Sequence, residues 1–433
     1  MKIERSKIIF VSFMLFSMFF GAGNLIFPPF LGQNAGEHAP VAMLGFIITA
    51  VVLPVLGILV IAQFKGMENL ANQVNGKFAL IFTILIYLSI GPGLGIPRAA
   101  SVPFELSIAP YLPKDASFTM YMLLYSVLFF AFSVWLALTP NKLVERMGKI
   151  LTPALLILLV VLFIGFLTKG NTGVAMPQEA YQVSPLSAGF IDGYQTMDAI
   201  AALNFGLVIS TTFIGMNVKE EKKVVHYTAI SGLIAGILLA IIYIMLGYMG
   251  MQTSALYEIK GNGAYTLRCI VEQLFGKPGA ILLAAIFALA CLTTCVGLIT
   301  SIAQYFSTLT SKISYKQWVM IVSVFSLIVC NQGLNMILSI SVPILNAIYP
   351  MAIVLILLGL VHKWIQNNKL IYPLTILLVG IESILFALNI ESVNAVLAKM
   401  LPLYTLGMGW VVVAVVSIIL SLVIGGVMQK NQK

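Results

Sequence analysis

Charge is the scarcest property of this sequence. Only 9% of its 433 residues are Asp, Glu, Lys or Arg, whereas a soluble globular domain carries roughly 25%. With 60% hydrophobic residues and a mean hydropathy of +1.03, the chain has too few polar residues to cover a soluble domain. The composition therefore predicts a polytopic membrane protein. The net charge of +9 does not indicate nucleic-acid binding, because the excess lies in short loops between apolar segments.

Residues that carry out catalysis or hold metals are also scarce. The chain has four cysteines and three histidines, and it contains no Cys-x-x-Cys pair and no His at metal-binding spacing. It also lacks a Gly-x-x-x-x-Gly-Lys-Ser/Thr phosphate loop and paired carboxylates at catalytic spacing. These absences argue against a disulfide framework, an intramembrane enzyme and an ATP-driven pump. We therefore expect a protein that is not an enzyme and that has no cofactor.

Long apolar runs, in contrast, fill the sequence. About 20 apolar residues cross a bilayer, and we predict twelve spans: 8–31, 41–64, 78–108, 118–138, 149–168, 188–216, 226–250, 279–307, 316–337, 341–362, 371–390 and 403–427. Most of the 24 Lys and Arg residues fall in inside loops when the N-terminus is cytoplasmic. The positive-inside rule then places both termini in the cytoplasm. The expected fold class is all-α, with one transmembrane domain over 1–433.

Two of the loops are long enough to form helices of their own. Residues 139–149 are predicted to form a short amphipathic helix on the cytoplasmic side. Residues 261–278 are predicted to form an outer re-entrant or surface helix that ends at Gly276 and Pro278. Either helix could move as a gate or lie as a plain interfacial helix.

Helix-breaking or polar clusters interrupt four of the predicted spans. They are Gly21–Asn24 in the first, Gly91–Gly95 in the third, Gly193–Ala199 in the sixth and Ala290–Cys295 in the eighth. At 1.5 Å per residue each cluster lies roughly 15–21 Å from a span end, near the middle of a ~30 Å core. Broken helices persist in a membrane only where they line a cavity or are buried in protein. The pattern indicates a shared midplane site, as in secondary transporters.

The positions of the breaks also predict an internal repeat. The interrupted first and sixth spans each begin a set of five spans, and two such sets run in opposite directions. We therefore expect a five-plus-five inverted repeat with broken helices 1 and 6. Repeat one covers about 8–168, repeat two about 188–362, and helices 11 and 12 over 371–427 are accessory.

Uncharged polar residues at the breaks are candidates for binding. Gly21 to Asn24 either allow close helix packing or form an unwound segment, whose half-helix N-terminus would bind a substrate carboxylate. Thr293 and Thr294 either bond to their own helix backbone or supply hydroxyl ligands to a desolvated Na⁺.

Charged residues inside the spans are candidates for coupling or gating. Asp198 would act on a substrate ammonium, on ion coupling or on a gate, or else form a structural pair with Arg98 or with a hydroxyl. Arg98 and Glu105 lie seven residues apart and share a helix face, so they form either an outer gate or a structural ion pair. Glu382 lies outside the repeat, and we favour a structural or oligomeric contact for it.

Several separated motifs give the chain a family resemblance. They are Phe-Gly-Ala-Gly-Asn-Leu-Ile-Phe-Pro-Pro at 20–29, Gly-Ile-Pro-Arg-Ala-Ala-Ser-Val-Pro-Phe-Glu at 95–105, Gly-Tyr-Gln-Thr-Met-Asp-Ala at 193–199, Asn-Gln-Gly at 331–333 and Ser-Val-Pro-Ile-Leu-Asn-Ala-Ile-Tyr-Pro at 341–350. The chain resembles the bacterial branched-chain amino acid:cation symporter family along essentially its whole length. The resemblance implies a leucine-transporter-like fold in the bacterial cell membrane and symport of leucine, isoleucine and valine with Na⁺ or H⁺.

The resemblance also implies site residues. The substrate would contact Ala22, Gly23, Asn24, Thr196, Met197, Asp198 and Ala199. A sodium ion would be held by the carbonyls of Ser17, Phe20 and Ala290 and by the hydroxyls of Thr293 and Thr294. Asp198 has no clear counterpart in more distant relatives, so its role is not transferred from them.

An ion or small-solute channel is the competing function. It is disfavoured because a channel needs a continuous polar lining, whereas these spans are apolar outside a few residues. The sequence does not choose between Na⁺ and H⁺, and it does not set the oligomeric state.

Overall fold

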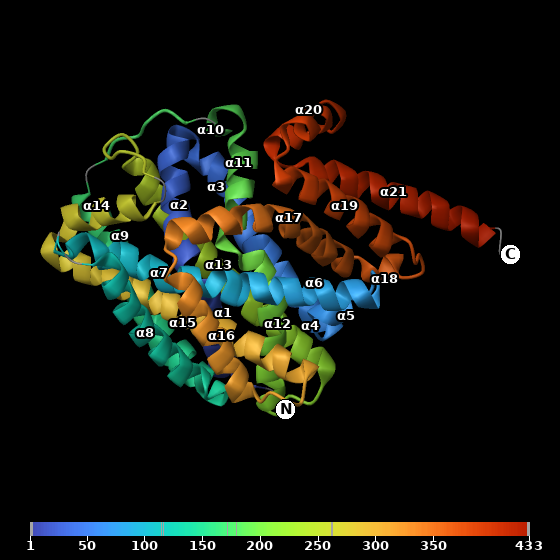
Figure 1. Ribbon diagram of the computed structural model, residues 1–433, viewed down its shortest axis with the longest axis horizontal. Helices are drawn as coiled ribbons and strands as arrows, with labels where there is room; N and C mark the ends of the chain where they lie inside the picture. The colour runs from blue at the N-terminus through green and yellow to red at the C-terminus, as the bar shows by residue number, and fades with distance from the viewer. Residues whose placement is uncertain are drawn as a thin grey trace.

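The protein is almost entirely helical in its computed structural model, which describes residues 3–113, 115, 117–170, 172–178, 180–260 and 263–430 (Figure 1). This part of the chain contains no β-strand. All-α architecture is therefore confirmed.

The first span is broken between α1 (Arg5–Phe19) and α2 (Ala22–Ala35). Gly21 is extended at the break, with φ −117° and ψ −155°, and its N–H donates to Asn24 Oδ1 at 2.9 Å. The predicted interruption over Gly21–Asn24 is thus shorter than expected, because Ala22, Gly23 and Asn24 already form the first turn of α2. Pro28 and Pro29 lie inside α2 and do not end it.

The sixth and third predicted spans are also interrupted. In the sixth, α11 (Pro185–Asp192) continues into a 3₁₀ turn, η7 (Gly193–Thr196), and α12 (Asp198–Gly215) follows. Met197 joins them in the left-handed region at φ +66°, a conformation that costs a non-glycine residue about 1–3 kcal/mol. In the third, α6 (Gly76–Leu88) and α7 (Gly95–Ser107) are joined by a π-helical segment, η3 (Ser89–Gly93), with a kink at Gly91.

The two broken spans pack reciprocally. The first span packs against the seventh, and the sixth span packs against the second. Both α1 and α2 contact α13 (Glu221–Gln252), while α11 contacts α3 (Ala39–Ile47) and α12 contacts α4 (Leu53–Phe64). A five-residue π-helix, η2 (Ile48–Val52), joins α3 to α4. This reciprocal packing is what an inverted repeat would produce.

Glycines permit this packing because backbone meets backbone at the crossings. A Cβ atom on Gly32 of α2 would lie 2.0 Å from the carbonyl oxygen of Gly247 on α13. A Cβ atom on Gly189 of α11 would lie 1.9 Å from the carbonyl oxygen of Ala42 on α3. Small residues of this kind allow close helix packing in membranes.

The remaining helices surround this centre. The long ones are α8 (Phe118–Ala137), α9 (Thr152–Lys169), α15 (Lys277–Leu309), α16 (Tyr315–Cys330), α17 (Leu334–Leu360), α19 (Ile371–Leu388) and α21 (Gly409–Lys430). The short ones are α5 (Met67–Ala71), α10 (Ala180–Val183), α14 (Ala264–Phe275), α18 (His362–Ile365) and α20 (Glu391–Met400). Figure 1 shows α19, α20 and α21 to one side of the molecule, where α19 contacts α17 and α21.

Four details of the predicted spans are corrected. The eighth span is the continuous helix α15, so Ala290–Cys295 does not break it. The ninth ends at Cys330 and the tenth begins at Leu334, because a turn at residues 331–333 separates α16 from α17. Residues 139–149 form a 3₁₀ turn, η5 (Pro140–Lys142), and a π-helix, η6 (Val144–Leu151), that continues into α9. Helix α20 was not predicted.

The predicted outer helix is present as α14. It ends before Gly276, which is left-handed at φ +58°, while residues 261 and 262 lie outside the described part of the chain. Because α14 contacts α2, α15, α9 and α7, it packs onto the helix bundle.

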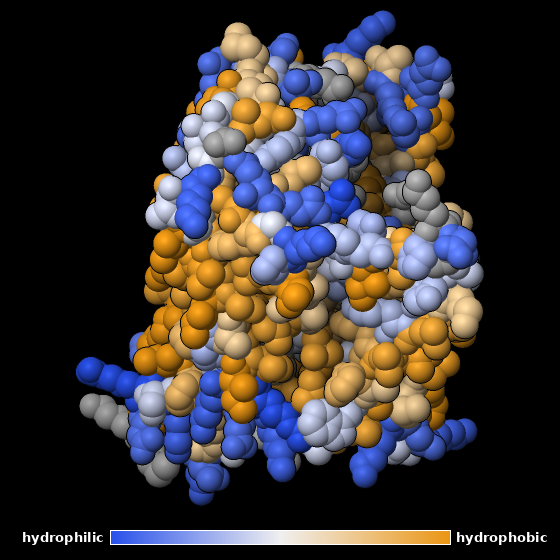
Figure 2. All heavy atoms as spheres, turned by 90° about the vertical axis from the view of Figure 1, so that its left-hand side faces the viewer, coloured by the Kyte–Doolittle hydropathy of each residue, from blue (hydrophilic) through white to orange (hydrophobic). Residues whose placement is uncertain are grey.

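The surface has the apolar band of a membrane protein. On the face shown in Figure 2, hydrophobic side chains form a broad band with hydrophilic side chains above and below it. Among the described residues, nine helical stretches are long and apolar enough to cross a membrane, and Tyr315–Cys330 and Gly409–Gly425 are shorter apolar helices. The span count of twelve stays a prediction.

Candidate functional site

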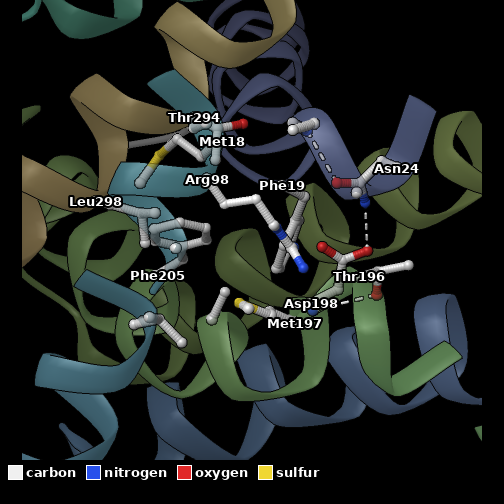
Figure 3. A pocket seen from close by; sticks show the side chains of 17 residues that line it. Met18, Phe19, Asn24, Arg98, Thr196, Met197, Asp198, Phe205, Thr294 and Leu298 are labelled. Carbon is white, nitrogen blue, oxygen red and sulfur yellow. Dashed lines mark hydrogen bonds between the residues drawn. The ribbon is translucent and has the colours of Figure 1, made fainter. Parts of the chain in front are cut away.

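A small cavity lies between the breaks of the first and sixth spans (Figure 3). It has about 30 Å³ of free space, enough for one or two water molecules. Its lining comes from the two breaks and from α1, α2, η3, α7, η7, α12 and α15. The lining residues are Met18, Phe19, Gly21, Ala22, Gly23, Asn24, Ile90, Gly95, Arg98, Ala99, Thr196, Met197, Asp198, Ala201, Phe205, Thr294 and Leu298. Most of the predicted substrate-binding residues therefore share one cavity. Ala199 is the exception, since it is buried in α12 and does not line the space.

Asn24 joins the two breaks through its side-chain amide. Its Oδ1 accepts the Gly21 N–H, and its Nδ2 donates to Asp198 Oδ2 at 2.7 Å. The first bond caps the start of α2 and fixes which way the amide faces. The second reaches across to the first residue of α12.

Asp198 is the centre of this polar network and is only 1% exposed. Its Oδ2 accepts hydrogen bonds from Asn24 and, at 2.7 Å, from the hydroxyl of Tyr243. Asn24 Nδ2 also contacts the Tyr243 hydroxyl. The Asp198 N–H donates to Thr196 Oγ1 at 3.3 Å, and Thr196 donates to the Gly193 carbonyl at 2.9 Å. No bond to Asp198 Oδ1 is found among the described residues.

Tyr243 was missed in the sequence. It lies on α13, is completely buried and connects α13 to both breaks. The available signal was a tyrosine inside the predicted seventh span, where a hydroxyl away from water needs a partner.

Arg98 of α7 is buried beside the same cavity. A Cβ atom on Gly23 would lie 2.8 Å from Arg98 Nη2, and the guanidinium lies over the Phe27 ring at 5.7 Å. Figure 3 shows the guanidinium and the Asp198 carboxylate directed into the same space. No salt bridge joins them in the described structure, and Nη1 is buried without a hydrogen-bond partner there.

The alternative pairing of Arg98 with Glu105 is not formed either. Glu105 Oε1 instead accepts the backbone N–H of Leu334 at 2.7 Å. A carboxylate in that position stabilises the N-terminus of α17. Glu105 therefore links α7 to α17 away from the cavity, and the expectation that it shares an ion pair with Arg98 is corrected.

Three of the five predicted sodium ligands, Ser17, Phe20 and Thr294, lie beside the first break. Thr294 Oγ1 donates to the Ser17 carbonyl at 3.2 Å, and a Cβ atom on Gly21 would lie 2.9 Å from that hydroxyl. The Ser17 carbonyl is one turn before Gly21, whose N–H is directed to Asn24 instead. Phe20 lies in the break itself.

Thr293 behaves differently from its neighbour. Its hydroxyl donates to the carbonyls of Leu289 and Ala290, at 2.9 and 3.0 Å, within its own helix. The structure thus brings Ser17, Phe20 and Thr294 to the break and leaves Thr293 and Ala290 bonded to each other. The sodium site stays a prediction. Among the described residues, no group of three or more His, Cys, Asp and Glu side chains could hold a metal ion.

The sequence matches the family described as branched-chain amino acid transport protein over residues 4–428. The chain belongs to this family. It is 42% identical to the branched-chain amino acid permease BraB of Bacillus subtilis, covering 98% of this chain and 97% of the relative. It is 38% identical to BrnQ of the same organism, another branched-chain amino acid permease, covering 96% of each chain. It is 39% identical to the branched-chain amino acid transport system 2 carrier protein of Pseudomonas aeruginosa, covering 95% and 94%.

Solved transporter structures share the fold. Mhp1, a nucleobase-cation-symport-1 family transporter, superimposes with a TM-score of 0.59 at 13% identity, covering 95% of this chain and 91% of that one. A manganese transporter of Eremococcus coleocola gives a TM-score of 0.55 at 14% identity, covering 96% and 94%. These similarities support the expected leucine-transporter-like fold, and the family is one of multi-pass membrane transporters, not enzymes.

Proposed function

We propose that this protein imports leucine, isoleucine and valine across a bacterial cell membrane as a secondary active symporter. Family membership and the relatives named as branched-chain amino acid permeases support the substrate class. The observation that carries the mechanism is a buried carboxylate, Asp198, facing the N-terminus of α2 across a small cavity at two helix breaks.

This cavity suits the two charges and the apolar side chain of such a substrate. The first-turn N–H groups of α2 lack helical acceptors and would bind the substrate carboxylate, with Arg98 adding positive charge. Asp198 Oδ1 would bind the substrate ammonium. Met18, Phe19, Phe205 and Leu298 would enclose the branched side chain.

Coupling to Na⁺ is the favoured mechanism. The Ser17 carbonyl and the Thr294 hydroxyl are hard oxygen ligands, and they lie at the same break as the N-terminus of α2. A cation bound there would hold the break in the geometry that binds substrate. Coupling to H⁺ is the alternative, in which Asp198 would carry the proton.

Because the cavity is too small for an amino acid as it stands, its walls must move during alternating access.

Uptake of radiolabelled leucine into proteoliposomes would test this function. Na⁺ and pH gradients are imposed separately, and we expect concentrative uptake with the inward Na⁺ gradient. Accumulation only with the pH gradient would select H⁺ coupling. A channel would show no acceleration of labelled leucine efflux by unlabelled leucine on the opposite side, and that result would reject the symporter.

A further inference from the structure

Glu382 is a buried carboxylate that the proposed transport mechanism does not use. Helices α17, α19 and α21 contain only two charged residues, Glu382 and Lys430, and Lys430 is the last residue of α21. Glu382 is 6% exposed and lies about 9 Å along α19 from the end that leads to α20. An ionised carboxylate at such a depth is costly unless it has a partner.

The carboxylate lines a second cavity, separate from the one at Asp198. This cavity holds about 10 Å³ of free space, close to the room for one water molecule. Its lining is Ile191, Tyr194, Asn346, Pro350, Glu382, Ser383, Phe386, Gly407 and Trp410. It therefore lies where α11, η7, α17, α19 and the start of α21 meet.

No cation or hydrogen-bond donor compensates Glu382 in the described structure. The neighbouring Ser383 hydroxyl donates to the carbonyls of Ala347 and Gly380 instead. The start of α21 lies directly on the carboxylate, because a Cβ atom on Gly409 would be 2.5 Å from Glu382 Oε1. The N-terminus of α21 therefore covers the carboxylate and carries a partial positive charge, but it donates no hydrogen bond to Glu382 in the described structure.

The other groups that face Glu382 carry no positive charge. The titratable ones are Tyr194 from η7 and Tyr404 from the short turn η8 (Tyr404–Leu406), which packs edge-on against Phe386. Helix α17 presents Asn346 and Pro350, and α21 presents Trp410. Asp192, at the end of α11, bonds to Tyr181 and does not line the cavity. Burial without a bonded cation or hydrogen-bond donor makes the charged form of a carboxylate costly.

The same cavity touches the contact that holds α21 to the sixth-span break. Trp410 Nε1 donates to the Tyr194 hydroxyl at 3.1 Å. The Tyr194 ring stacks on Tyr349 of α17, with ring centres 4.4 Å apart and planes 16° apart. Tyr194 belongs to η7, the turn that leads through Met197 to Asp198. The cavity around Glu382 therefore adjoins η7, which also lines the cavity at Asp198.

We propose that the cavity around Glu382 is a proton-binding site, and that the bound proton keeps α21 packed on the break of the sixth span. With the proton bound, the cavity is neutral and dry, and Trp410 stays in contact with Tyr194. Loss of the proton leaves a charge that draws in water and loosens this contact. Only the effect on uptake rests on the proposed transport function, since proton binding is measurable without transport.

Trp410 itself reports on the cavity. In a variant with Trp135, Trp318 and Trp364 changed to Phe, Trp410 is the only tryptophan, so selectively excited tryptophan emission comes from Trp410 alone. We expect its emission to shift to the red as the pH of purified protein in nanodiscs rises from about pH 5 to about pH 9. Glu382→Gln should abolish the shift, whereas Glu391→Gln, an exposed carboxylate on α20, should preserve it. An unchanged shift in Glu382→Gln, or no shift in the parent, would overturn the proposal.

Leucine uptake at a fixed Na⁺ gradient supplies the second measurement. The parent should lose uptake as pH rises, and Glu382→Gln should remove that part of the pH dependence. Tyr194→Phe keeps the ring but deletes the acceptor of the Trp410 bond, so it should uncouple uptake from Glu382 while the Trp410 titration persists. Equal pH profiles for parent and Glu382→Gln would refute control of transport. Absence of leucine uptake in every protein, with the Trp410 titration intact, would count against the proposed function instead.

Discussion

At the scale of single residues, Asn24 determines how the two broken spans meet. Its carbonyl caps α2 through Gly21, so its amide nitrogen has to face Asp198 and Tyr243. The geometry therefore transmits a change at the Asp198 carboxylate to the start of α2. Because a substrate ammonium would bind that carboxylate, substrate occupancy and the geometry of the first break are joined through one side chain.

Asp198→Asn tests the role of that carboxylate. The amide keeps the shape but loses the negative charge and the ability to titrate. Because a hydrogen bond to a charged group contributes about 1.5–3 kcal/mol, leucine affinity should fall by roughly 10- to 150-fold while membrane insertion is retained. Leucine binding and uptake are both measured. If Arg98→Gln restores uptake when combined with Asp198→Asn, the two residues form only a structural pair.

Thr294→Ala and Thr293→Ala form a matched pair for the sodium site. Only Thr294 directs its hydroxyl across to the Ser17 carbonyl, whereas Thr293 bonds within α15. We therefore expect Thr294→Ala to lower the apparent Na⁺ affinity by about tenfold, or ~1.4 kcal/mol, and Thr293→Ala to change it little. Alanine is well tolerated in helices, so both should express. Na⁺ dependence unchanged from that of the parent in both variants would remove α15 from the ion site.

At the scale of helices, breaks caused by backbone chemistry were predictable and contacts between helices were not. Gly21, Gly91 and Gly193 mark interruptions that the structure contains, because glycine and proline act locally on the chain. The threonines of α15 do not break their helix. The Thr293 hydroxyl bonds within α15 and the Thr294 hydroxyl bonds to Ser17, and neither bond removes a backbone hydrogen bond of the helix. The partners of Glu105 and the role of Tyr243 depend on long-range packing, which helical periodicity does not specify.

The glycine crossing between α2 and α13 gives a prediction at this scale. In Gly32→Ala the new methyl group would meet the Gly247 carbonyl at 2.0 Å, and backbone cannot move away cheaply. We expect a destabilisation of about 1–3 kcal/mol, measured by thermal unfolding of the purified protein. Gly215→Ala at the exposed end of α12 is the control, because nothing lies within 4 Å of its Cβ position. Equal melting temperatures for the two variants would show that α2 and α13 do not pack this closely.

At the scale of the whole molecule, the reciprocal packing of the broken spans is the arrangement that the proposed alternating access would need. Helices α1 and α2 pack on α13, and α11 and α12 pack on α3 and α4, so each broken span has an equivalent partner in the other half. Helices α19 and α21 lie outside the two packed pairs but touch them. Helix α19 contacts α17, and Trp410 of α21 donates a hydrogen bond to Tyr194. That arrangement permits alternating access only if the repeats are oriented oppositely in the bilayer, which makes the topology the decisive property.

Cysteine labelling in intact cells tests this topology. With the N-terminus inside, the segment between α15 and α16 is cytoplasmic, and three spans (α16, α17 and α19) bring α20 to the outer surface. In a Cys269→Ser background, a membrane-impermeant maleimide should label Lys399→Cys on α20 directly. It should label Lys312→Cys, in the turn before α16, only after permeabilisation. The remaining cysteines, Cys291, Cys295 and Cys330, are buried and should not be labelled.

Labelling of both positions from the same side would mean that an even number of spans separates them. Helix α16, the shortest of the three at 16 residues, would then be the helix that does not cross the membrane.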